Sequence, residues 1–80
     1  MPRYFFDIFN GEAGPVDLRG HELDDEAAAR AVALQTLADV ARKDIPRGGE
    51  ARITVRVRRN GVPIYSAVMT LNEQWIRLDS

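Results

Sequence analysis

The sequence predicts a single α+β domain in which one long amphipathic helix covers one face of a four-stranded antiparallel sheet. Three observations predict this fold class. Residues 51–59 alternate between apolar and polar side chains and are followed by Asn-Gly, residues 4–9 are aromatic and β-branched, and the segment between them has a helical period. Because a chain of 80 residues cannot divide its apolar side chains between two cores, residues 1–80 are expected to form one domain.

The first predicted strand, residues 4–9, has the aromatic and β-branched side chains that suit a pleated sheet. Turn-forming residues follow at 10–11 and again at 14–15. A short second strand is therefore expected at 16–18, ended by Gly20, and the two strands would form a hairpin.

Asp7 decides which side chains of the first strand face the core. A carboxylate is expected to point to water, and side chains alternate between the two faces of a strand. Phe5 and Phe9 share the side of Asp7, so we expect both rings on the sheet face that the helix leaves bare. The core side would hold Tyr4, Phe6 and Ile8.

The helix is predicted to run from the carboxylates at 24–26 to about Asp44. Asp24 can cap the first free N–H groups, and the other carboxylates favour the positive end of the helix dipole. Pro46 and the glycines at 48–49 end the helix. At 100° per residue, one arc is apolar and rich in small residues, which allows the helix to lie close to the sheet. This arc consists of Ala27, Ala31, Leu34, Leu37, Ala38 and Ala41.

The last two predicted strands form a hairpin around Asn60-Gly61, since both residues tolerate the positive φ of a type I′ turn. A two-residue loop then places Arg56 opposite Tyr65. By the same register Arg52 lies opposite Met69, and these four side chains are expected on the helix-free face. The inward side chains of the alternating strand are Ile53, Val55 and Val57.

The element order is therefore β-β-α-β-β. The helix returns the chain so that the third strand runs antiparallel to the first, which joins the two hairpins and gives the sheet order 2-1-3-4. Residues 72–80 are left open between one helical turn capped by Asn72 and a short extra strand. The second face of the sheet has no covering element in this prediction.

Composition and charge exclude several classes of protein. Without cysteine, disulfide scaffolds and thiolate metal sites are excluded and a reducing interior is expected. No apolar run approaches the roughly 20 residues of a membrane-spanning helix, and no signal-peptide core is visible, so we expect a cytoplasmic protein without a membrane partner. The net charge of −1 gives no general attraction to nucleic acid. Residues 1–46 hold five basic and nine acidic side chains, whereas residues 47–80 hold six and three, so the last hairpin is mildly basic.

The chain resembles a known family in its opening Met1-Pro2-Arg3-Tyr4-Phe5-Phe6-Asp7-Ile8, its Asn10-Gly11 turn, its Gly20-His21-Glu22-Leu23 step and its alanine-rich helix. The family consists of short bacterial proteins that begin M-P-R-Y-F-F and have a hairpin rich in aspartate and glycine, a G-x-E-L step and an A-x-x-x-A helix. Its members form a domain of unknown function. The resemblance covers about the whole chain and is most specific in the first six residues. It implies a bacterial cytoplasmic origin and the order β-β-α-β-β, and it supplies no activity and no site residues.

The sequence offers little for catalysis or metal binding. His21 is the only histidine and lies near Glu22 and the carboxylates at 24–26, which could be drawn as a metal site. Helix capping accounts for these carboxylates, and a single imidazole leaves no second nitrogen ligand, so no metal and no cofactor is expected. Ser66 is expected to face the helix and Ser80 follows the last element, so neither suggests a nucleophile. The protein is therefore not expected to be an enzyme.

The bare sheet face is where we expect a function. Its large apolar side chains are too many for an exposed surface on so short a chain, and the C-terminal tail, a second copy or another protein could cover them. The arginines would then form the polar rim of the contact. The predicted function is a non-catalytic homodimer or protein-interaction module, and its predicted contact residues are Phe5, Phe9, Arg52, Arg56, Tyr65 and Met69.

Single-stranded nucleic acid is the alternative partner for the same face. Arginines interleaved with aromatic rings on an open sheet offer backbone charge and stacking surfaces. The arginines are Arg52, Arg56, Arg58 and Arg59, and the rings are Tyr65, Phe5 and Phe9. Alternating arginines are also typical of a solvated strand, and a pI of about 5.7 argues against a strong electrostatic footprint. Self-association is therefore the first hypothesis.

Overall fold

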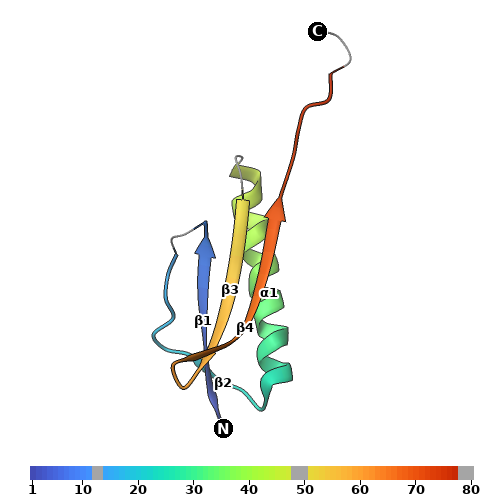
Figure 1. Ribbon diagram of the computed structural model, residues 1–80. Coiled ribbons are helices and arrows are strands. Elements are labelled where there is room, and N and C mark those ends of the chain that lie inside the picture. The colour runs from blue at the N-terminus through green and yellow to red at the C-terminus, as the bar shows by residue number, and fades with distance from the viewer. Residues whose placement is uncertain (12–13, 48–50, 78–80) are drawn as a thin grey trace.

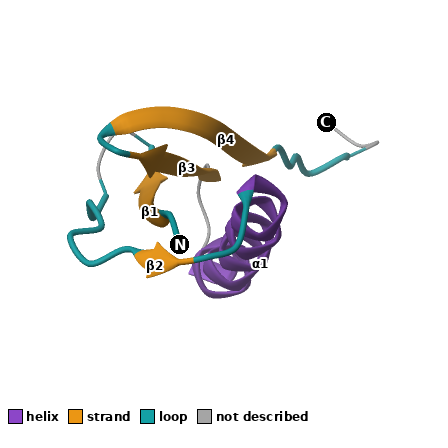
Figure 2. Ribbon diagram, turned by 90° about the horizontal axis from the view of Figure 1, so that it is seen from below, coloured by secondary structure: helices purple, strands orange, loops and turns teal. Residues whose placement is uncertain are grey.

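The structure is a computed structural model that describes residues 1–11, 14–47 and 51–77. Within these ranges, four strands form one antiparallel sheet and one α-helix lies on a single face of it (Figure 1, Figure 2). The elements are β1 (Arg3–Asn10), β2 (His21–Glu22), α1 (Glu26–Asp44), the 3₁₀ helix η1 (Ile45–Arg47), β3 (Ala51–Arg59) and β4 (Val62–Leu71). The sheet order is β2-β1-β3-β4, and every neighbouring pair is antiparallel. The predicted fold class, element order and strand order are confirmed.

The core lies between α1 and the two central strands. β1 contributes Tyr4 and Phe6, which are buried, and Ile8 packs against the same cluster. Three alternating side chains of β3 are fully buried, as predicted: Ile53, Val55 and Val57. Because side chains alternate along a strand, the side chains between these core positions, such as Phe5 and Asp7 of β1 and Arg56 of β3, lie on the helix-free face.

α1 begins one residue later than predicted. Asp25 rather than Asp24 is the N-cap, and its carboxylate accepts a hydrogen bond from the Ala28 N–H at 2.9 Å. The helix ends at Asp44 as predicted and continues as η1, while the two glycines at 48–49 lie outside the described residues. No helix in the described part of the chain is both long and apolar enough to cross a membrane.

The face of α1 that packs on the sheet differs in part from the predicted arc. Leu37 and Ala41 are buried as predicted, but the other buried positions are Ala29 and Ala33. Four positions of the predicted arc are exposed: Ala27, Ala31, Leu34 and Ala38. Alanines lie on several faces of this helix, so its hydrophobic period alone does not distinguish one arc from the next. The packed face still consists largely of small residues, which lets the helix lie close to the sheet.

The predicted second strand at 16–18 is wrong. The strand that pairs with β1 is β2, which has only two residues and lies opposite the start of β1. Residues 14–20 run beside β1 as a loop (Figure 1), and we call them the covering loop. The side chain of Asp17, rather than a backbone carbonyl, accepts the hydrogen bond from the N–H of Phe6 at 3.0 Å. The carboxylate of Asp17 thus takes the place of the backbone carbonyl that a neighbouring strand would offer to Phe6.

The hairpin of β3 and β4 turns at Asn60-Gly61, where both residues have the predicted positive φ, 53° and 76°. The register beyond the turn is not the predicted one. Val57 pairs with Tyr65 instead of Ile64, so Ile64 is an extra residue on β4. Pro63, the residue before it, has no N–H to donate to the ladder, and regular pairing is interrupted there.

This bulge moves the later side chains of β4 to the opposite face of the sheet. The predicted positions of Tyr65 and Met69 on the helix-free face are therefore wrong. Tyr65 pairs with Val57 and packs against the core under the helix. Met69 pairs with the buried Ile53 and lies on the same side. Ser66 moves the other way, from the predicted helix side to the helix-free face.

Residues 72–77 form neither of the two structures left open by the sequence. They leave the end of β4 as an extended segment that projects away from the sheet and the helix (Figure 1), and we call them the arm. The molecule is correspondingly long, with extents of 60 × 22 × 18 Å.

Candidate interaction site

The helix-free face holds a buried ion pair. Asp7 lies on this face as its parity predicts, but it is only 3% exposed and does not point to water as predicted. Arg58 of β3 donates from Nε to Oδ2 of Asp7 at 2.7 Å and from Nη2 to Oδ1 at 3.0 Å. This bidentate pair satisfies both carboxylate oxygens and joins β1 to β3.

The covering loop lies over this ion pair, which is why Asp7 is buried. The backbone N–H of Asp17 donates to Oδ1 of Asp7 at 3.0 Å. The carbonyl oxygen of Asp17 accepts from Nη2 of Arg58 at 2.8 Å. One loop residue therefore contacts both partners of the pair, and the loop cannot leave without breaking these hydrogen bonds.

The carboxylate of Asp17 organises the same loop. Its Oδ2 accepts the N–H of Phe6 on β1, and its Oδ1 accepts the N–H groups of Arg19 and Gly20 at 3.0 and 3.1 Å. Gly20 has a φ of +71°, and a Cβ there would lie 2.8 Å from the carbonyl oxygen of Tyr4. The tight approach of the loop to β1 therefore depends on glycine at this position.

The carboxylates of Asp7 and Asp17 are both held in the ionised form. The hydrogen bond from Arg58 lowers the pKa of Asp7 below its ordinary value of 3.8, although burial acts in the opposite direction. Asp7 in turn raises the pKa of Arg58. Burial also opposes ionisation of Asp17, but the N–H groups that its carboxylate accepts outweigh burial and lower its pKa as well. These charges are all used within the fold, so we assign them a structural role.

The two edges of the sheet differ. The edge of β1 is covered by β2 and by the covering loop, where the carbonyl of Pro15 accepts the N–H of Ile8 at 3.1 Å. The outer edge of β4 has no backbone partner among the described residues. An unpaired edge presents a row of free N–H and C=O groups that can pair with another strand. We call the outer edge of residues 62–71 the β4 edge.

β4 also lacks the features that usually keep edge strands apart. None of its ten residues is charged, and its one proline, Pro63, lies near its start. Six of the ten large apolar side chains exposed in the described chain belong to β4 and the arm: Val62, Ile64, Val68, Met69, Trp75 and Ile76. Most of the large apolar side chains exposed in the described ranges therefore lie on β4 and on the arm that continues from it.

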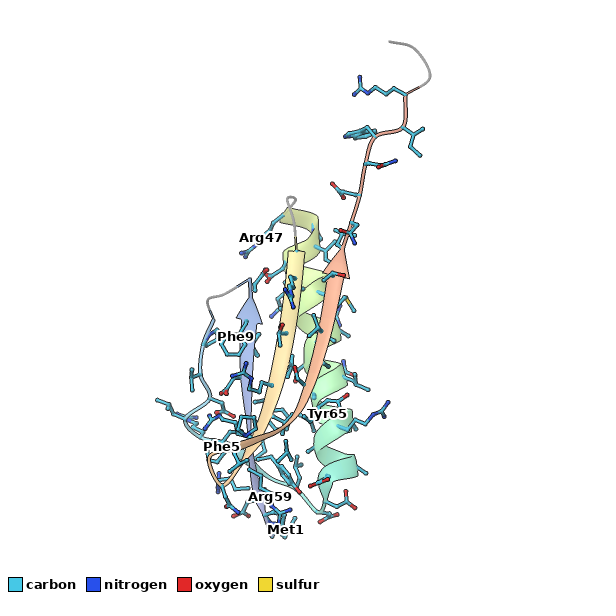
Figure 3. All side chains as sticks on the ribbon, in the orientation of Figure 1. Met1, Phe5, Phe9, Arg47, Arg59 and Tyr65 are labelled. Carbon is cyan, nitrogen blue, oxygen red and sulfur yellow. The ribbon has the colours of Figure 1, made fainter. Side chains whose placement is uncertain are left out.

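Four of the six predicted contact residues do share the helix-free face: Phe5, Phe9, Arg52 and Arg56. Figure 3 shows Phe5 and Phe9 on β1, apart from Tyr65 beside the helix. The guanidinium of Arg56 lies 5.2 Å from the ring centre of Phe9, and that of Arg58 lies 5.1 Å from the ring centre of Phe5. Both rings are half-buried. The face is thus partly covered by its own arginines and by the covering loop.

A shallow concavity of about 380 Å³ lies on the same face, lined by Phe9, Gly11, Arg52, Thr54 and Arg56. Within the described ranges, neither arginine has a carboxylate partner. Two guanidinium groups beside a hydroxyl and an aromatic ring are suited to an anionic ligand.

A second concavity lies between the start of α1 and the start of β4, and sequence reasoning missed it. It has a volume of about 240 Å³ and is lined by Glu26, Ala27, Ala29, Arg30, Ile64 and Tyr65. We call it the α1–β4 groove. No local pattern signals this groove, because it depends on the bulge that turns Tyr65 toward the helix.

A protein family described as Domain of unknown function (DUF6894) matches residues 3–70. The chain belongs to this family. The match begins at the first residue of β1 and ends one residue before the end of β4, so it leaves out the arm. Neither the curated proteins nor the solved structures compared with the chain gave a match.

The residues around His21 in this DUF6894 domain have other contacts. The His21 ring packs edge-on against Phe6, with ring centres 5.7 Å apart. Glu22 lies 3.4 Å from Nη2 of Arg3, and Asp25 caps α1. In the part of the chain that the structure describes, no three His, Cys, Asp or Glu side chains are grouped to hold a metal ion.

Proposed function

We propose that this protein is a non-catalytic interaction module of the bacterial cytoplasm that forms a homodimer, with β4 of one copy paired to β4 of the other. The observation that supports it is the difference between the two sheet edges. The chain covers the edge of β1 with its own residues, whereas the outer edge of β4, a strand of ten uncharged residues, has no backbone partner in the described structure. The lack of cysteine supports a reducing compartment.

Antiparallel pairing about a twofold axis would satisfy the free backbone groups of both edges at once. It would also remove from water the apolar side chains on both faces of β4, such as Val68 on the helix-free face and Met69 on the helix side. The product is a continuous eight-stranded sheet with the two helices on the same face. An edge of this length and composition would otherwise be a site of aggregation.

This proposal moves the contact from the helix-free face to the β4 edge. The rings of Phe5 and Phe9, predicted as contact residues, already stack with arginines of their own chain. The covering loop occupies another part of that face through its hydrogen bonds to Asp7 and Arg58. The β4 edge has no such cover within the described residues.

Light scattering at micromolar concentrations measures the association. The unaltered protein is expected to be a dimer, and Val68→Lys is expected to be a monomer because a lysine on an edge strand opposes strand pairing. Val68 is 49% exposed, so the longer side chain can be accommodated without entering the core. Leu18→Lys is the matched control, since Leu18 is an exposed aliphatic residue at the opposite edge of the sheet.

The variant Phe9→Asp distinguishes a dimer contact at the β4 edge from a contact on the helix-free face. If β4 forms the contact, this variant remains dimeric, because Phe9 lies on β1 with β3 between it and β4. A protein that is monomeric at every concentration contradicts the proposal. A dimer that is lost in Phe9→Asp and kept in Val68→Lys contradicts it as well and returns the contact to the helix-free face.

A second candidate function, single-stranded nucleic-acid binding, is favoured by the concavity beside Phe9. Arg52 and Arg56 lie four residues apart on one strand, which places two cationic groups about 13 Å apart along the face. Both lack carboxylate partners in the described chain, and the concavity that they line also holds the Phe9 ring, which a base could stack on if it displaced the guanidinium of Arg56.

Fluorescence anisotropy of a labelled single-stranded oligonucleotide at low salt tests this candidate. Binding is expected to weaken in Arg56→Ala and at higher salt. Arg42→Ala is the control, because Arg42 lies on α1 and pairs with Asp39 at 2.6 Å. No change in anisotropy at low salt would remove nucleic acid from consideration.

A further inference from the structure

The arm holds two large apolar side chains away from the body of the molecule. Trp75 is 87% exposed and Ile76 is 79% exposed, and the segment extends beyond the end of the sheet (Figure 1). We propose that the arm of each copy docks in the α1–β4 groove of a second copy, with Trp75 as the side chain that fills the groove. This inference rests on the pairing of β4 strands proposed above.

The arm cannot place Trp75 in the groove of its own copy. The groove includes Tyr65, which lies six residues before Leu71, or about 20 Å back along β4. Trp75 follows Leu71 by four residues, and a reversal of the chain uses at least two of them. An arm folded back on its own strand would therefore bring Trp75 no further than Thr70.

The arm of a second copy reaches the groove without any reversal. α1 and β4 run in the same direction (Figure 1), and the groove lies where both begin. When two β4 strands pair antiparallel about a twofold axis at Thr70, near the end of the strand, Leu71 of one copy lies beside Met69 of the other. The arm then continues along the earlier residues of β4 in the second copy. In an extended chain Trp75 has the same parity as Leu71 and Tyr65, which places it on the helix side.

The charges that flank Trp75 complement those of the groove. On α1, Glu26 and Arg30 lie one turn apart on the groove wall, and neither has an ion-pair partner among the described residues. On the arm, Glu73 and Arg77 lie two residues to either side of Trp75.

The direction of the arm brings opposite charges together. Because the arm runs antiparallel to β4 of the second copy, it also runs antiparallel to α1 of that copy. Glu73 of the arm then lies beside Arg30 of the second copy, and Arg77, further along the arm, lies beside Glu26 of the second copy. Trp75 lies between these two pairs, over the apolar part of the groove. The apolar lining consists of Ala27, Ala29, Ile64 and Tyr65.

Fluorescence tests this arrangement, because Trp75 is the only tryptophan in the chain. Acrylamide quenching is measured across the concentrations at which light scattering detects the dimer. We expect quenching to fall and the emission to shift to shorter wavelength at the same midpoint. Ala27→Arg, at an exposed position of the groove, is expected to abolish this protection and to weaken the dimer about tenfold. Ala38→Arg, about three turns further along α1, is the control.

The outcomes separate the two proposals. Protection of Trp75 that is lost in Ala27→Arg and kept in Ala38→Arg supports docking of the arm. A dimer in which Trp75 remains as accessible to acrylamide as in the monomer overturns the docking and leaves the pairing of β4 intact. Protection that does not depend on concentration places the arm on its own copy and also overturns the docking. Absence of any dimer overturns both proposals.

Discussion

Asp7 and Arg58 are joined by two hydrogen bonds, of 2.7 and 3.0 Å, on the sheet face that has no helix. The covering loop shields this pair from water, and Asp17 contributes its backbone N–H and C=O groups to the same network. The sheet therefore has an apolar core under α1 and a smaller polar one under the loop. The covering loop, which the ion pair holds in place, also covers the edge of β1. Among the described residues, the β4 edge is therefore the open edge of the sheet.

Asp7→Ala is expected to lower the free energy of unfolding by about 3 kcal/mol, because it leaves a partly buried guanidinium without its carboxylate. Asp39→Ala is the matched control. Asp39 also pairs with an arginine, but on the exposed surface of α1, where such pairs contribute less than about 1 kcal/mol. Urea unfolding at neutral pH measures both variants. Similar losses for the two would contradict a special role for the buried pair.

The stability of the fold is expected to decrease in acid. The pKa values of Asp7 and Asp17 lie below 3.8 in the folded protein, so in acid the unfolded chain takes up protons before the folded chain does. Their contribution is fully present above pH 3.8 and is lost as the pH falls through the lowered pKa values. Urea midpoints measured from neutral pH downward should show this decrease, with a shallower slope in Asp7→Asn. An identical slope in that variant would contradict the assignment.

Local patterns were sufficient for the fold class but not for the face on which β4 places its side chains. The alternation along β3 and the turn at Asn60-Gly61 depend on neighbouring residues only, and both are confirmed. The extra residue Ile64 depends on how the ladder accommodates Pro63, and a shift of one residue moves every later side chain to the other face. For this reason Tyr65 and Met69 were placed on the wrong side.

The burial of Asp7 could not be predicted for a different reason. Its parity was correct, because parity depends only on alternation along β1. Its partner Arg58 lies 51 residues further along the chain, and the loop that covers both has no regular secondary structure. The open β4 edge could not be predicted either. An edge can be identified as the open one only when it is known which segments cover the other edge of the sheet.

Gly14→Ala is expected to detach the covering loop from β1. A Cβ at Gly14 would overlap the carbonyl oxygen of Ile8, whereas one at Gly11 would meet no atom within 4 Å. Gly11→Ala is therefore the control, although its positive φ adds a strain of about 1 kcal/mol. The measurement is hydrogen exchange at the amides of Ile8 and Phe6, whose acceptors both lie in the loop. Faster exchange in Gly14→Ala and not in Gly11→Ala is the expected result, and unchanged exchange in both would contradict the attachment.

Thr70 provides a test of the strand register in the proposed dimer. If Trp75 of one copy lies opposite Tyr65 of the other, Thr70 falls on the twofold axis and lies directly opposite Thr70 of the second copy. It is exposed and lies on the helix-free face, paired with Arg52 of β3. Thr70→Lys and Thr70→Glu would each place like charges directly opposite one another, so each variant alone is expected to be monomeric.

An equimolar mixture of Thr70→Lys and Thr70→Glu is expected to recover the dimer, because a lysine then faces a glutamate across the axis. Light scattering of the separate and mixed samples measures this recovery. Leu18→Lys mixed with Leu18→Glu is the control and should associate equally whether separate or mixed, since Leu18 lies at the opposite edge. Separate Thr70 variants that remain dimeric, or a mixture that stays monomeric, would contradict this register and the placement of Trp75 in the groove beside Tyr65.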